Sequence, residues 1–180
     1  MTRAPGSECS IVARVARRIK KTRLVFCEGA EDKAFFDCIK ALYLRDGYSI
    51  DIKRGAGGYQ VHLVEEAIRR GDIYGGKYIA IDGDRDATEM KEAQQLAVRH
   101  NLVMLRTAPC LERLLINILE PAKRTASWSS SKCKKYFESR YISAGKRTNM
   151  RTYAAIFTKD ILDEARIRLP ELDEIINVFS

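Results

Sequence analysis

Three carboxylates follow an apolar run in the middle of the chain. The run covers residues 78–81 (Tyr-Ile-Ala-Ile), and Asp82, Asp84 and Asp86 come directly after it at intervals of two. Such a run is typical of an interior parallel strand, so we expect Asp82 and Asp84 to emerge together at its carboxyl end. Gly83 lets the backbone turn between them. Two carboxylates on one side offer oxygen ligands to a hard cation such as Mg²⁺ or Mn²⁺.

A second apolar run, upstream of the first, also ends in an acid. Residues 24–27 (Leu-Val-Phe-Cys) precede Glu28 and Gly29, and a further acid, Glu31, follows two residues later. In open α/β sheets, sites form at the edge where the carboxyl ends of parallel strands meet. The two runs therefore predict one acidic pocket that contains Glu28, Asp82 and Asp84.

Residues 24–119 resemble the Toprim domain, which occurs in topoisomerases, bacterial primases and OLD-family nucleases. Its signature is a strand that ends in Glu-Gly, followed later by a strand that ends in Asp-x-Asp. Cys-Glu-Gly-Ala-Glu-Asp at residues 27–32 is similar to the opening of small RloB-like and OLD-nuclease-type members. Ala-Pro-Cys-Leu-Glu-Arg-Leu-Leu at residues 108–115 is similar to the Asn-Pro-Cys-Phe-Glu-Leu-Trp-Leu segment of RloB-like proteins.

The resemblance implies a nuclease that hydrolyses phosphodiester bonds with Mg²⁺ or Mn²⁺. The catalytic residues would be Glu28, Asp82 and Asp84, with Glu28 either a metal ligand or the group that moves the proton. Glu31 matches the acid that joins a second metal site in OLD-type nucleases, and Asp86 is a candidate for outer-shell support. The candidate metal-binding residues are thus Glu28, Glu31, Asp82, Asp84 and Asp86.

The same resemblance implies a role in antiphage or restriction-type defence. OLD proteins carry an ATPase module that this chain lacks, so we expect a separately encoded ATPase or other defence-system protein as a partner. No tyrosine can be assigned as a topoisomerase nucleophile. The alternative from another class is a Toprim-like module that binds nucleic acid or a nucleotide without cutting, or a subunit of a larger nucleic-acid-processing complex.

The sequence leaves two alternative roles for each of two further residues near these motifs. Arg85 is a candidate for phosphate contact or for a structural salt bridge. Glu112 is expected in the first turn of a helix near the acidic edge, where it would hydrogen-bond a metal-bound water or an arginine. An acid that only stabilises the amino terminus of that helix is the alternative.

The elements that must position these residues alternate along the chain. Strands are expected at residues 24–27, 48–53, 78–81 and 102–105, and helices at 31–44, 59–70 and 87–100. This rhythm predicts an α/β, Rossmann-like fold with a central, mostly parallel four-stranded sheet flanked by helices. We expect three segments: a basic tail and helix (1–22), a Toprim-like core (23–107) and a helical extension (108–180), basic at 121–151.

A glycine cluster at residues 54–58 joins the second strand to the next helix. Glycine-rich turns of this kind can bind phosphate through backbone N–H groups, which makes Gly29, Gly57 and Gly58 candidates for such contacts. The cluster matches neither a dinucleotide-binding motif nor a P-loop, so a plain flexible turn is the alternative.

Positive charge is concentrated in two segments of the chain, whose net charge is +8. Residues 1–23 contain seven Lys or Arg and one acid, and residues 121–151 contain nine and one, which leaves the rest of the chain at −6. An acidic body with basic segments suits a nucleic-acid partner, whereas two solvated faces are the alternative. The candidate nucleic-acid-binding residues are Lys132, Lys134, Lys135 and Arg140.

Aromatic side chains are interleaved with this basic segment. Tyr136, Phe137 and Tyr141 would stack on bases or pack against the domain. Residues 10–21 predict a basic amphipathic helix that docks on the sheet, lies along nucleic acid or forms an interface.

Composition excludes several other classes. The 46% hydrophobic and 31% charged residues fit a globular protein rather than a disordered one. No apolar run reaches membrane-spanning length and the amino terminus has no secretory h-region, so we expect no membrane association and a cytoplasmic location. The five cysteines form no Cys-x-x-Cys pair, and we expect Cys27, Cys38 and Cys110 in the core.

Overall fold

The computed structural model describes residues 21–84 and 86–180. The predicted basic helix at 10–21 lies outside the described residues except for Lys21, with which the first strand begins. Arg85 also lies outside them, so neither of its predicted roles is addressed by the structure.

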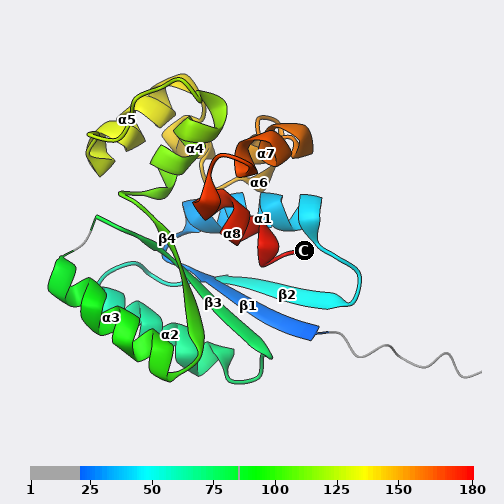
Figure 1. Ribbon diagram of the computed structural model, residues 1–180, viewed down its shortest axis with the longest axis vertical. Helices are drawn as coiled ribbons and strands as arrows, with labels where there is room; N and C mark the ends of the chain where they lie inside the picture. Colours follow the sequence, from blue (N-terminus) through cyan, green and yellow to red (C-terminus); the bar gives the residue numbers. More distant parts are fainter. Residues whose placement is uncertain (1–20, 85) are drawn as a thin grey trace, which may run out of the picture.

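Four parallel strands form the central sheet, as the sequence predicted. They are β1 (Lys21–Cys27), β2 (Tyr48–Arg54), β3 (Gly76–Asp82) and β4 (Leu102–Thr107), and their order is β2-β1-β3-β4. Because the chain passes from β1 to β2 on one side and then to β3 on the other, the strand order reverses at β1 (Figure 1). The fold is therefore α/β and Rossmann-like, and the sheet is parallel throughout.

Two helices cover one face of this sheet. They are α2 (Gln60–Gly71) and α3 (Ala87–Arg99), which lie side by side below the strands in Figure 1. Phe26, Ile79 and Ile81 of the sheet are buried against Leu63 and Met90 of these helices. Alternate side chains of β1 and β3 thus pack against α2 and α3, and the side chains between them face the opposite side of the sheet.

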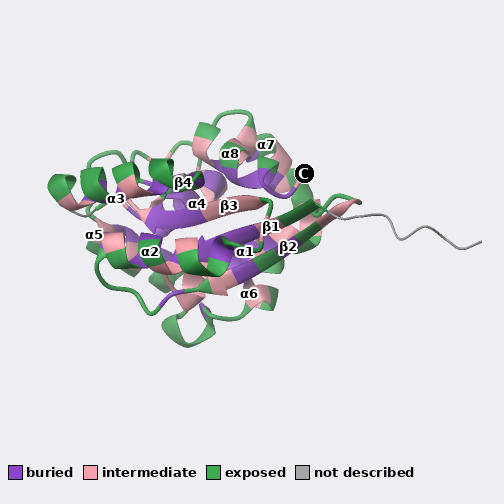
Figure 2. Ribbon diagram, turned by 90° about the horizontal axis from the view of Figure 1, so that it is seen from below, coloured by how far each residue is buried: buried purple, intermediate pink, exposed green. Residues whose placement is uncertain are grey.

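The opposite face is covered by the remaining helices. They are α1 (Ala30–Tyr43), α4 (Leu111–Leu119), α5 (Ser130–Arg140), the 3₁₀ turn η1 (Ala144–Lys146), α6 (Met150–Ala154), α7 (Lys159–Arg166) and α8 (Pro170–Asn177). Phe35 of α1 contacts the rings of Tyr153 and Phe157, and Phe36 contacts Phe179. The helical extension therefore shares one hydrophobic core with α1 and the sheet, and its inner surfaces are buried (Figure 2).

The cysteines of the described chain are core residues. Cys27, Cys38 and Cys110, as expected, and also Cys133 are fully buried and free. Burial raises the pKa of the Cys27 thiol well above its usual range, which disfavours a nucleophilic thiolate. No helix among residues 21–84 and 86–180 is long and apolar enough to cross a membrane.

Candidate functional site

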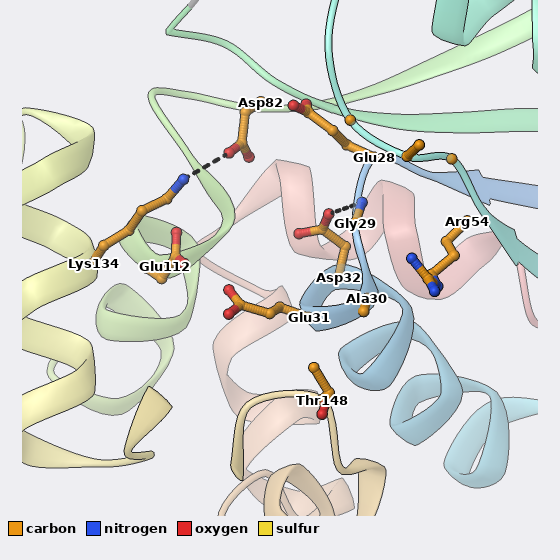
Figure 3. Close-up of a pocket in the computed structure, with 13 residues that line it drawn as sticks. Glu28, Gly29, Ala30, Glu31, Asp32, Arg54, Asp82, Glu112, Lys134 and Thr148 are labelled. Atoms are coloured by element: carbon orange, nitrogen blue, oxygen red, sulfur yellow. Dashed lines mark hydrogen bonds and ion pairs between the residues drawn. The ribbon is translucent and has the colours of Figure 1, made fainter. Parts of the chain in front are cut away.

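The carboxyl ends of β1 and β3 define one edge of an open pocket. Glu28 follows β1 and Asp82 ends β3, and these strands are neighbours with Cys27 paired to Ala80. The pocket has a volume of about 430 Å³ and lies at the point where the strand order reverses, which is where α/β sheets bind ligands. Figure 3 shows its lining: Glu28, Gly29, Ala30, Glu31, Asp32, Arg54, Gly55, Ala56, Gly57, Asp82, Glu112, Lys134 and Thr148.

Asp82 is held in a fixed orientation at the end of β3. Its Oδ1 atom accepts hydrogen bonds from the Leu111 N–H at 3.0 Å and from the Thr107 hydroxyl at 3.2 Å. Burial raises the pKa of Asp82 to about 7, and the nearby charge of Asp32 adds to this effect. Because Oδ1 is engaged by the first turn of α4, Oδ2 is the oxygen presented to the pocket.

Lys134 reaches Asp82 from α5. Its Nζ atom lies 3.7 Å from Asp82 Oδ2, as Figure 3 shows. Burial lowers the pKa of Lys134, but the negative charges of Glu112 and Asp82 outweigh that effect and raise it. A residue predicted to lie on a nucleic-acid route therefore points into the acidic pocket.

Glu28 is oriented by a residue that sequence reasoning missed. The side-chain amide of Gln60, at the start of α2, donates a hydrogen bond of 3.2 Å to Glu28 Oε2. Gln60 is fully buried, and its Oε1 atom has no hydrogen-bond partner among the residues described. In the sequence, Gln60 is marked only as a polar residue shortly after the glycine cluster. That signal is too weak to identify a functional residue.

The Glu-Gly turn is built by the first residues of α1. Gly29 caps this helix, and its N–H donates a hydrogen bond of 2.8 Å to Asp32 Oδ2. Burial raises the pKa of Asp32 to about 6, although the Gly29 hydrogen bond opposes the shift. Gly29 therefore lines the pocket with its N–H engaged within the turn.

Glu31 and Glu112 meet at a buried arginine. Arg147 Nη2 lies 2.6 Å from Glu31 Oε2 and also hydrogen-bonds Glu112 Oε1. Glu112 lies in the first turn of α4, as predicted, and is 5% exposed. The expected hydrogen bond between Glu112 and an arginine is therefore present, with Arg147 as the donor. Burial raises the pKa of Glu31, while the Arg147 charge opposes that shift.

Asp84 and Asp86 are not among the residues that line the pocket, although the charge of Asp84 contributes to the raised pKa of Lys134. Strand β3 ends at Asp82, Gly83 forms a bend, and Asp84 is exposed and is not one of the residues that line the pocket. A Cβ atom on Gly83 would lie 3.1 Å from Ala108 Cβ, which explains why glycine is needed there. Asp86 caps α3 by accepting hydrogen bonds from Thr88 and Glu89 N–H groups, and its pKa is lowered by them. The structure thus gives Asp86 a capping role at the start of α3.

The glycine cluster forms part of the pocket wall. Gly57 lines the pocket and Gly58 does not, and both have positive φ angles, of 74° and 110°. Arg54, at the end of β2, is exposed and adds a positive charge to the wall. This loop could therefore contact an anionic ligand through Arg54.

The four candidate nucleic-acid-binding residues do not share one surface. Lys132 lies over the Trp128 ring at 4.5 Å and borders a shallow groove with Lys135 and Tyr136. Arg140 Nε lies 3.6 Å from Glu120 Oε1. Helical spacing explains the division, because residues 132 and 135 share a face of α5 whereas residue 134 points towards the pocket.

The fit of the pocket to Mg²⁺ or Mn²⁺ depends on how its acids are arranged. No group of three or more His, Cys, Asp or Glu side chains in the described part of the chain is arranged to hold a metal ion as it stands. The acids instead contact Lys134 and Arg147. The donor set nevertheless suits a hard cation, since five carboxylates line the pocket. Glu112 Oε2 is buried there and has no hydrogen-bond partner among residues 21–84 and 86–180.

The fold and this pocket define a Rossmann-like α/β protein with an acidic site at the carboxyl edge of its sheet. Comparison of the chain with protein-family models gives no match, and comparisons with curated proteins and with solved structures give no significant match.

Proposed function

We propose that this protein is a Toprim-type nuclease that hydrolyses phosphodiester bonds in nucleic acid with Mg²⁺ or Mn²⁺. The observation that carries the proposal is the meeting of Glu28 and Asp82 in one pocket, at neighbouring strand ends and at the point where the strand order reverses. Such positions bind ligands in α/β sheets, and carboxylates there are ligands for hard cations.

The pocket residues would have different roles in this reaction. Asp82 Oδ2 and Glu28 would hold the cation, and Thr107 and the Leu111 N–H keep Asp82 oriented through Oδ1. A bound divalent cation would neutralise charge on the phosphate and lower the pKa of a water molecule. Lys134, displaced from Asp82, would bind a phosphate oxygen as a point charge.

Glu28 is the candidate for proton transfer. Its carboxylate is oriented by Gln60, and it lies on the wall opposite Lys134 in Figure 3. An ionised carboxylate only accepts hydrogen bonds, so Glu28 would accept a proton from a water molecule placed beside it. Glu28 as a metal ligand alone remains the alternative within this proposal.

A non-catalytic binding module is the second candidate, and one observation favours it. Lys134 and Arg147 contact Asp82, Glu31 and Glu112, so part of the acidic charge is neutralised within the protein. Asp84, which a Toprim metal site would use, lies outside the pocket lining. Under this alternative the same pocket would bind a nucleotide or nucleic acid without cleavage.

A paired measurement distinguishes the nuclease from the binding module. The melting temperature is measured against Mn²⁺ concentration, and cleavage is measured on single-stranded and duplex DNA and RNA. The nuclease proposal expects Mn²⁺ to raise the melting temperature and to support cleavage, and expects Asp82→Asn to abolish both effects. Glu164→Gln, which changes an exposed acid outside the pocket, is the matched control. Binding of nucleic acid without Mn²⁺-dependent stabilisation or cleavage would favour the binding module.

A further inference from the structure

Arg147 is a buried cation between two carboxylates of the pocket. Its side chain is 8% exposed, and one nitrogen, Nη2, contacts both Glu31 and Glu112. The three residues come from distant parts of the chain: Glu31 from α1, Glu112 from α4, and Arg147 from the turn after η1. A single positive group therefore bridges two acids, as a metal ion does when carboxylates share it.

We infer that Arg147 replaces a second metal ion, so that the site binds one divalent cation, held by Asp82 and Glu28. This inference rests on the proposed metal-dependent function. In two-metal sites the ions lie about 3.5–4 Å apart and both need carboxylate ligands. Asp32 accepts a hydrogen bond from the Gly29 N–H, and the other acids of the lining that a second ion could use are Glu31 and Glu112. Arg147 already contacts both.

The two cations of the pocket differ in how readily they can leave. The Lys134 side chain is 45% exposed and contacts Asp82 at 3.7 Å, so it can move into solvent when a metal ion binds. Arg147 is buried, and a guanidinium stays charged at any pH at which the protein folds. Moving it out would leave Glu31 and Glu112 unpaired, which is strongly destabilising for Glu112 because that side chain is buried. A metal ion can therefore displace Lys134 from Asp82, whereas Arg147 stays between Glu31 and Glu112.

One oxygen beside the Arg147 pair is still available. Five carboxylates line the pocket, and Arg147 contacts two of them, Glu31 and Glu112. Glu112 Oε2 is buried and unpartnered in the described chain, so this oxygen can accept a hydrogen bond from a water of the single bound ion.

The number of bound ions tests the inference directly. We expect titration of the full-length protein with Mn²⁺, followed by calorimetry and electron paramagnetic resonance, to give one tightly bound ion per chain with the spectrum of an isolated Mn²⁺. Two ions with a spin-coupled spectrum would overturn the inference and leave the nuclease proposal standing. No bound ion would instead overturn the nuclease proposal, and this inference with it.

A variant series provides a second test. Arg147→Met should allow a second Mn²⁺ to bind between Glu31 and Glu112, and Arg147→Met combined with Glu112→Gln should return the count to one. Arg151→Met, which removes an exposed arginine nearby, is the matched control and should keep one ion. A folded Arg147→Met protein that still binds a single ion would contradict the inference. If that variant does not fold, the number of Mn²⁺ ions bound by the unmodified protein still tests the inference.

Discussion

The Nζ atom of Lys134 lies 3.7 Å from Oδ2 of Asp82, so a basic helix of the carboxyl-terminal extension contacts the acidic end of β3. Lys134 and a divalent cation would therefore compete for the same oxygen. The pair links two parts of the chain that are far apart in the sequence, the acidic strand ends and the basic segment at 121–151.

Replacing Lys134 should separate metal binding from nucleic-acid binding. We expect Lys134→Met to raise Mn²⁺ affinity on the order of tenfold, because removing a like charge near the site is worth about 1–4 kcal/mol. The same change should weaken nucleic-acid binding. Lys135→Met removes an equal charge from the outer face of α5 and should leave Mn²⁺ affinity unchanged. Calorimetric titration with Mn²⁺ provides the comparison, and equal affinity in both variants would exclude the competition.

Asp82→Asn should remove function without unfolding the protein. The asparagine Oδ1 can still accept the hydrogen bonds from Leu111 and Thr107, whereas the negative charge beside Asp32 disappears. The metal-free melting temperature should therefore stay equal or rise, while Mn²⁺-dependent stabilisation and cleavage are lost. Asp82→Ala, which also loses the hydrogen bonds, should cost roughly 1–3 kcal/mol more in unfolding free energy. A metal response that survives Asp82→Asn would contradict the assignment.

Arg147 and Glu112 should behave as a coupled pair. Arg147→Met leaves the buried Glu112 and the partly exposed Glu31 without their cation. Breaking the buried pair with Glu112 should cost roughly 3–5 kcal/mol of unfolding free energy. Glu112→Gln combined with Arg147→Met removes one of those acids and should cost less than the sum of the single changes. Urea denaturation of the four proteins in this cycle provides the measurement. Additive losses would show that the contact contributes little.

Glu120 should make the anchoring of α5 depend on pH. It accepts hydrogen bonds from the hydroxyls of Tyr141 and Tyr136, and these lower the pKa of Glu120 to about 2. A lowered pKa stabilises the folded protein at pH values above the unfolded value of about 4.5, and this contribution is lost as pH falls towards 2. Glu120→Gln should therefore lower the melting temperature at pH 7 by a few degrees. The difference from the unmodified protein should shrink between about pH 5 and pH 2, and a constant difference would contradict this.

The outer face of α5 should bind nucleic acid through Lys132 and Lys135. Reversing both to Glu should weaken binding and reduce the slope of log affinity against log salt by about two, because two phosphate contacts are lost. Mn²⁺ affinity should not change, since neither residue lines the pocket. Arg69→Glu, on the far side of the sheet, is the control for net charge. An unchanged salt slope would leave this face without a role in binding.

The sequence by itself determined the parallel sheet and the placement of Glu28 and Asp82 at one edge of the pocket. Apolar runs that stop at acids predicted β1 and β3, and the alternation of strands and helices predicted parallel pairing. Because parallel strands end at one edge, the approach of Glu28 to Asp82 followed from the order of these segments. These features depend on local patterns and on general rules of connection, so a single sequence contains them.

The tertiary structure alone decided which partners the acids have. Lys134 and Arg147 reach the pocket because α5 and the turn after η1 pack beside α4, and that packing depends on the side chains of a core distributed along the whole chain. The exposure of Asp84 was also not predictable, because it depends on β3 ending at Asp82, which pairs with Thr107, and on Gly83 turning beside Ala108. Sequence spacing fixes which residues share an element. Contacts between elements arise from packing, and they set the orientation, burial and charge of the site.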